Sequence, residues 1–80
     1  MLPVAFVVIN TEIGYMDAVL EEVRAIEGVR EAHTVFGVYD IIAKIEAGDM
    51  SRLKNIVTTR IRGLNNVRST LTMIVMEKEH

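Results

Sequence analysis

The sequence predicts an α+β domain of the ferredoxin-like βαββαβ type, with a four-stranded antiparallel sheet and two helices on one face of it. Segments with strand periodicity and segments with helix periodicity follow one another in the order strand, helix, strand, strand, helix, strand. The pattern also repeats, because the helix-ending Gly28 and Gly63 lie 35 residues apart and the strand starts Ala5 and Ile41 lie 36 apart. Two right-handed βαβ units joined by a hairpin interleave into a sheet of strand order 4-1-3-2.

Length and composition limit the possibilities further. The 80 residues suffice for one domain, residues 1–80, and the 50% of apolar residues exclude a disordered chain. The absence of cysteine excludes disulfides, zinc-thiolate sites and thiol nucleophiles, and we expect neither a cofactor nor a metal. A net charge of −2 has the wrong sign for neutralising phosphates, so we expect no direct DNA binding by this chain alone. The apolar opening, residues 2–9, is far shorter than the roughly 20 residues of a membrane span, and we expect a cytoplasmic protein.

The first half of the chain supplies a strand, a helix and a second strand. Residues 4–9 are continuously apolar and mostly β-branched, which predicts a central strand covered on both faces. Gly14 opens the first helix and Gly28 ends it. Its apolar stripe has the spacing of one helix face and consists of Met16, Val19, Leu20, Val23 and Ile26. A second strand, residues 29–36, follows.

The second half repeats this order after a hairpin turn at residues 37–40. Alternate residues of the next strand share one core face, namely Ile41, Ala43, Ile45 and Ala47. Asp49 is the expected N-cap of a second helix, which runs to about Gly63. Its apolar face comprises Met50, Leu53, Ile56, Val57, Ile61 and Leu64. After a turn at Asn65 and Asn66, residues 67–76 alternate as a long last strand.

One face of this sheet lies without helices. The first strand is apolar on both sides, and we expect Ile74 and Met76 of the last strand to lie on the uncovered face beside its threonines. Sheet-to-sheet pairing with a second copy would cover that face, so we predict at least a dimer.

Few residues are candidates for chemistry. The chain has no G-x-S-x-G, H-E-x-x-H, P-loop or dinucleotide-binding motif. His33 and His80 are its only histidines, and we interpret the first as an ordinary sheet residue and the second as part of a disordered terminus.

The charges are segregated between the two expected helices. Acidic residues lie on the first helix, at Asp17, Glu21, Glu22 and Glu27, and basic residues lie on the second helix and beyond it, at Arg52, Lys54, Arg60, Arg62 and Arg68. Solvated helix faces explain this most simply. A contact between unlike helices in an oligomer is the alternative, and nucleic acid ranks third.

The most informative segment is residues 36–42, FGVYDII. An ordinary hairpin turn is one interpretation. The other is a site for a free amino acid, because Asp40 can accept from an ammonium group, turn amides can donate to a carboxylate, and Gly37 allows close approach. Thr70 and Thr72 share one face of the last strand and can add hydroxyl hydrogen bonds, although threonine is also a common strand residue.

These residues resemble the effector domain of the Lrp/AsnC regulators, also called the RAM domain. The segment GVYDII at 37–42, then Lys44-Ile45 and Ala47-Gly48-Asp49, is similar to the signature of that family. The similarity continues through the second helix to VRSTLTMIV at 67–75, so it spans essentially the whole chain.

The resemblance implies an assembly and a ligand. Such domains pair through their sheets into dimers, which assemble into octamers or decamers and bind amino acids between dimers. By this resemblance Gly37, Tyr39, Asp40, Thr70 and Thr72 lie near the effector pocket. Full-length regulators carry a helix-turn-helix before this domain, whereas here the domain begins at Met1. The resemblance therefore implies a stand-alone sensor, able to mix with full-length Lrp/AsnC paralogues.

Two alternatives remain open from the sequence. The first is a structural or interaction oligomer that has lost the pocket. The second is a small dimeric α+β-barrel enzyme that shares this topology and uses Tyr39, Asp40 or His33 as acid or base.

Overall fold

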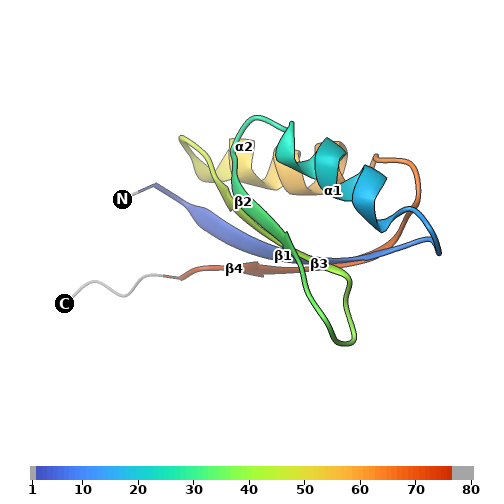
Figure 1. Ribbon diagram of the computed structural model, residues 1–80. Coiled ribbons are helices and arrows are strands. Elements are labelled where there is room, and N and C mark those ends of the chain that lie inside the picture. The colour runs from blue at the N-terminus through green and yellow to red at the C-terminus, as the bar shows by residue number, and fades with distance from the viewer. Residues whose placement is uncertain (1, 77–80) are drawn as a thin grey trace.

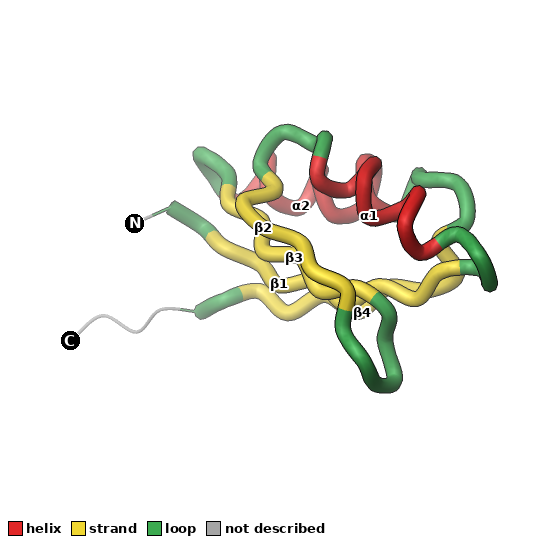
Figure 2. Tube along the Cα trace, in the orientation of Figure 1, coloured by secondary structure: helices red, strands yellow, loops and turns green. Residues whose placement is uncertain are grey.

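A computed structural model describes residues 2–76 and confirms the expected fold class. The strands are β1 (Val4–Thr11), β2 (Val29–Thr34), β3 (Ile41–Glu46) and β4 (Val67–Ile74); the helices are α1 (Met16–Arg24) and α2 (Met50–Asn55), and α2 continues into the π-helical segment η1 (Ile56–Ile61). The strands form one antiparallel sheet of order β2-β3-β1-β4, as predicted. Both helices lie on one side of the sheet, and the β2–β3 loop projects to the other side (Figures 1 and 2). Within residues 2–76 no helix has the length and apolar character needed to cross a membrane.

The core lies between the helices and one face of the sheet. In β1, buried residues alternate with partly exposed ones, so within one chain only one face of this central strand is covered, not both. The predicted core face of β3 is confirmed. The side chains buried in the core are Ala5, Val7, Ile9, Val19, Val23, Ile26, Ala32, Ile41, Ala43, Ile45, Ala47, Leu53, Val57 and Ile61.

The helix-free face is apolar along β1 and β4 and also carries Glu31, His33 and Lys44 on β2 and β3. The prediction of which β4 residues lie on it was wrong. Ile74 pairs with Ala5 and packs against the core, because directly opposed residues of paired strands point to the same side of a sheet. Met76 lies beyond the end of β4. The residues on the uncovered side are instead Leu71 and Met73, which pair with Val8 and Phe6.

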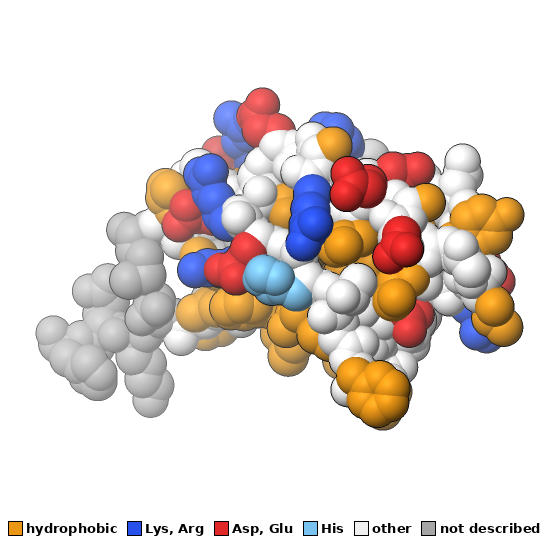
Figure 3. Space-filling model, in the orientation of Figure 1, with side chains coloured by type: hydrophobic (Ala, Val, Ile, Leu, Met, Phe, Trp, Pro, Cys, Tyr) orange, Lys and Arg blue, Asp and Glu red, His pale blue; other side chains and the backbone are white. Residues whose placement is uncertain are grey.

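We call this surface the open face and define it by Phe6, Val8, Ile42, Leu71 and Met73. Leu71 and Met73 are 50% and 48% exposed. Hydrophobic side chains gather along the underside of the sheet, away from the helices (Figure 3). The open face is therefore an apolar surface that the chain itself leaves uncovered.

The second helix begins as predicted and continues differently. Asp49 is its N-cap, and the Asp49 Oδ1 atom accepts from the Arg52 amide at 2.8 Å. The α-helix then gives way to the π-helical turn of η1. Leu53, Val57 and Ile61, spaced four apart, are all buried. Residues four apart lie on the same face of a helix, so these three side chains form one buried stripe.

Candidate functional site

The loop between β2 and β3 is a hairpin whose base is fixed and whose tip is bare. The Val35 amide donates to the Asp40 carbonyl at 2.9 Å, and the Asp40 amide donates to the Ile9 carbonyl at 3.0 Å. Phe36 and Val38 at the tip are 108% and 86% exposed. The loop extends beyond the sheet, with apolar side chains at its end (Figures 1 and 3). Two large apolar side chains thus point away from their own chain.

The Asp40 carboxylate ties this hairpin to the end of β1. Its Oδ2 atom accepts from the Thr11 amide at 2.9 Å and from the Thr11 hydroxyl at 3.2 Å. Thr11 is buried, and Asp40 is half-buried. Because both bonds go to Oδ2, the Oδ1 atom is left to accept from an incoming donor. Asp40 can therefore position the hairpin and contact a ligand at the same time.

Gly37 and Tyr39 complete the predicted hairpin group. A Cβ atom added to Gly37 would meet nothing within 4 Å, and its backbone is not left-handed. The chain's own packing therefore does not require glycine at this position, although an approaching molecule would benefit from the open space. Tyr39 is half-buried next to Asp40.

The two threonines lie on the helix side of β4, in different states. Thr70 Oγ1 accepts from Arg62 Nε at 3.3 Å. Thr72 Oγ1 is buried and has no hydrogen-bond partner among the described residues. A buried polar atom without a partner costs free energy and calls for a ligand, a water molecule or a neighbouring subunit.

Arg62 is the residue that sequence reasoning missed. It was assigned to a general basic group, but it lies directly after η1 and contacts Thr70. π-Helical turns occur frequently at functional sites. Leu53, Val57 and Ile61 have the spacing of an ordinary amphipathic helix, so residue types carried no signal for that turn.

Within one chain, the predicted site residues form two separate groups. Ile9 of β1 pairs with Ile41 on one side and with Thr70 on the other. The hairpin base and the threonines are thus separated by β1, two strand spacings of about 4.8 Å each. A shallow cavity of about 360 Å³ beside β4 includes Thr70 and no hairpin residue. Within one chain the two groups of candidate residues therefore lie apart, on opposite sides of β1.

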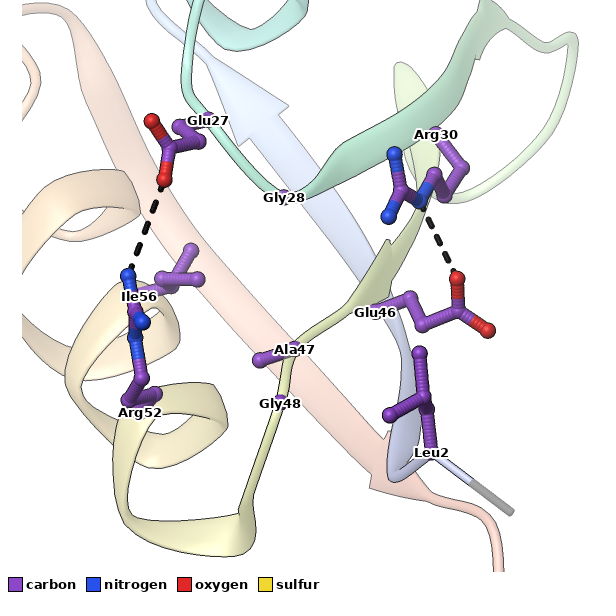
Figure 4. Close-up of a pocket in the computed structure, with 9 residues that line it drawn as sticks. All are labelled: Leu2, Glu27, Gly28, Arg30, Glu46, Ala47, Gly48, Arg52 and Ile56. Carbon is purple, nitrogen blue, oxygen red and sulfur yellow. Dashed lines mark hydrogen bonds and ion pairs between the residues drawn. The ribbon is translucent and has the colours of Figure 1, made fainter.

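A second cavity, of about 310 Å³, lies at the opposite end of β2 and β3 (Figure 4). Arg30 Nε lies 3.1 Å from Glu46 Oε1, and an Arg52 nitrogen lies 3.6 Å from Glu27 Oε1. The second pair joins the basic and acidic helical regions inside one chain. Its four charged side chains are paired with one another, so this cavity presents no uncompensated charge to a ligand.

The histidines add no metal or acid–base centre to the described region. His33 Nε2 lies 3.0 Å from Glu31 Oε1, and this hydrogen bond holds the pKa of Glu31 below its ordinary value. Residues 2–76 contain no group of three or more His, Cys, Asp or Glu side chains placed to hold a metal ion. His80 lies outside the described residues.

Comparison with known proteins agrees with this structure. Residues 4–79 match the family described as the Lrp/AsnC ligand binding domain. A homocitrate synthase of Sulfolobus acidocaldarius is 41% identical over 64 residues, which are 80% of this chain and only 14% of that enzyme. The chain thus spans about a seventh of the length of the curated relatives it matches.

Solved structures show the same fold. A hypothetical protein of Pyrococcus horikoshii is 33% identical with a TM-score of 0.87, and the match covers 98% of this chain and 94% of that one. A transcriptional regulator of Neisseria meningitidis, solved as a complex with L-Met, has a TM-score of 0.79 at 17% identity; the match covers 99% of this chain and 53% of the regulator. The family match over residues 4–79 and the shared fold together show that this chain belongs to the Lrp/AsnC ligand-binding domain family.

Proposed function

We propose that this chain is an amino-acid-binding regulatory module whose effector binds between subunits. The division of the candidate site into two halves carries this proposal. The hairpin half exposes its tip to solvent, and the β4 half holds a buried hydroxyl without a partner. A hairpin contributed by one subunit and a β4 face contributed by another would complete both.

The hairpin has the chemistry that the backbone groups of an amino acid need. Asp40 Oδ1 is an acceptor for an ammonium group, and the loop amides are donors for a carboxylate. The open space at Gly37 allows a ligand to approach the backbone closely. Family membership makes ligand binding the expected role of the domain.

The relatives support a ligand-sensing role that can serve more than one kind of protein. The matched segment is a small part of an enzyme named homocitrate synthase, and the same fold forms about half of a transcriptional regulator solved with L-Met. A domain found beside such different partners is more economically explained as a ligand sensor than as a DNA-binding or catalytic unit. His33 is hydrogen-bonded to Glu31 and not to Tyr39 or Asp40, the other two residues considered for the enzyme alternative.

Assembly would begin at the open face. Pairing two open faces removes apolar side chains from water, and a two-fold arrangement is the commonest solution. Further contacts through the exposed Phe36 and Val38 would then join dimers into a ring. Co-assembly with a full-length Lrp/AsnC regulator would let an effector bound to this chain change that regulator's assembly.

A thermal-shift screen of the common amino acids tests the proposal. A ligand present at 100 times its dissociation constant adds about 2.7 kcal/mol to stability, which moves the unfolding midpoint of a small domain by several degrees. We expect one or a few amino acids to do so. If no amino acid raises the midpoint of a protein that is already a stable oligomer, the sensor proposal is refuted and a purely structural oligomer is indicated.

Variants of the hairpin locate the site. Asp40→Asn keeps an acceptor for Thr11 but removes the charge that binds an ammonium group, so the folded protein should lose most of the ligand shift. Asp17→Asn is the matched control, because Asp17 is an exposed carboxylate of α1 far along the chain from the hairpin. If the ligand raises the unfolding midpoint equally in both variants, Asp40 does not contribute to the site.

A further inference from the structure

We propose that the effector carries an acidic side chain and that Arg62 binds its side-chain carboxylate. This inference rests on the proposed function and adds the chemical class of the ligand. It concerns the β4 half of the site, where the sequence had indicated only the two threonine hydroxyls.

The cavity beside β4 has an excess of positive charge. It is lined by Arg62, Val67, Arg68, Ser69 and Thr70. Arg68 lies 3.7 Å from Glu12 and is partly neutralised by it, whereas Arg62 forms no ion pair with any acid among residues 2–76. One guanidinium in the cavity is therefore available to an anion.

Arg62 is exposed, and one hydrogen bond orients its guanidinium. Its Nε donates to Thr70 Oγ1, which leaves the two terminal nitrogens of the guanidinium as donors. The next residue is confined to glycine, because a Cβ atom at Gly63 would lie 2.5 Å from the Thr59 carbonyl oxygen. Glycine thus lets the chain leave the π-helical turn directly after Arg62. A positioned guanidinium is suited to bidentate binding of a carboxylate.

The two halves of the site divide the amino acid between them. If Asp40 and the hairpin amides hold the ammonium and the α-carboxylate, the β4 half contacts the side chain. That half offers a guanidinium and the Thr70 hydroxyl, both of which line the cavity. A carboxylate satisfies these donors. A cationic side chain would be repelled, and an apolar one would leave the donors without acceptors.

Calorimetric titration with aspartate, glutamate, asparagine and glutamine tests the inference, because each acid and its amide have nearly the same shape. Loss of a hydrogen-bonded charge should weaken binding about tenfold or more, so we expect aspartate or glutamate to bind at least tenfold tighter than its amide. Arg62→Gln should abolish this preference, and Arg62→Lys should keep part of it. Arg60→Gln, which changes a nearby arginine outside the β4 cavity, should leave it intact.

The outcomes separate this inference from the proposed function. If an amide or an apolar amino acid binds as tightly as the acids, the module is a sensor but its acidic specificity is refuted. If the preference for acids survives in Arg62→Gln, the role of Arg62 is refuted. If none of the common amino acids binds, the proposed function fails as well.

Discussion

Replacing Thr72 with valine tests whether the β4 face is built for a ligand at the expense of stability. The substitution keeps the shape of the side chain and exchanges the hydroxyl for a methyl group. Thr72 Oγ1 is buried without a partner, and such an atom costs about 1–3 kcal/mol. Valine also suits a strand. We therefore expect Thr72→Val to stabilise the ligand-free protein, although most substitutions destabilise.

The expected shift is large enough to measure. For a domain of this size, 1 kcal/mol moves the unfolding midpoint by roughly 4–8 °C. Differential scanning calorimetry at one fixed protein concentration is the assay, because the midpoint of an oligomer depends on concentration.

Thr70→Val is the matched control on the same strand face. The Thr70 hydroxyl already accepts from Arg62 in an exposed hydrogen bond, so its removal should change stability by no more than about 0.5 kcal/mol. A fall in midpoint for Thr72→Val would refute the reasoning, because it would show that the Thr72 hydroxyl is already bonded in the ligand-free oligomer.

Three further predictions follow from the fold. Gly28 has φ +101°, and a Cβ atom there would lie 3.1 Å from the Glu46 carbonyl oxygen, whereas Gly14 has φ +88° and nothing within 4 Å. Gly28→Ala should therefore lower the free energy of unfolding, measured by chemical denaturation, by about 2 kcal/mol or more, against about 1 kcal/mol for Gly14→Ala. Equal costs would contradict the packing argument. Met73→Lys places a charge on the open face and should shift sedimentation toward the monomer, whereas an unchanged species would mean that another surface pairs. His33→Ala removes the hydrogen bond that lowers the pKa of Glu31, so NMR titration should show that pKa rising toward its ordinary value. A carboxyl group with a lowered pKa stabilises the fold when it is ionised, and this stability is lost as the pH falls through the lowered pKa. The variant should therefore lose less stability on acidification.

The fold could be predicted because each element carries its own periodicity. Alternation in residues 41–47 and helical spacing in residues 16–26 fixed the element types, and the internal repeat fixed their order. Asp49 was identified as a cap from its residue type and position alone. These signals are local, and each agreed with the final architecture.

The failures arose where tertiary contacts decide. Alternation divides the last strand into two sets of residues but does not say which set faces the helices, and only pairing with buried Ala5 places Ile74 inside. The α-to-π transition has no signal in the residue types, because Leu53, Val57 and Ile61 have the spacing of an ordinary helix. The contact of Arg62 with Thr70 joins two elements, so it was not visible from residue types either.

The candidate site was predicted as a set of residues but not as an arrangement. The sequence predicted Asp40 as a ligand-binding acid and carried no sign of its bond to Thr11, which is 29 positions away along the chain. It also gave no indication that β1 separates the hairpin from the threonines. Long-range strand pairing determines both.

A subunit-mixing experiment tests the central claim, that one subunit's hairpin and another's β4 face form a shared site. Asp40→Asn damages only the hairpin half, and Arg62→Gln damages only the β4 half. Oligomers refolded from a mixture of the two variants contain some sites in which both halves are intact. We predict that calorimetry with the identified effector shows full-affinity sites in the mixture that neither parent variant has. A mixture that binds no better than its parents would contradict the claim and place the whole site within a single chain.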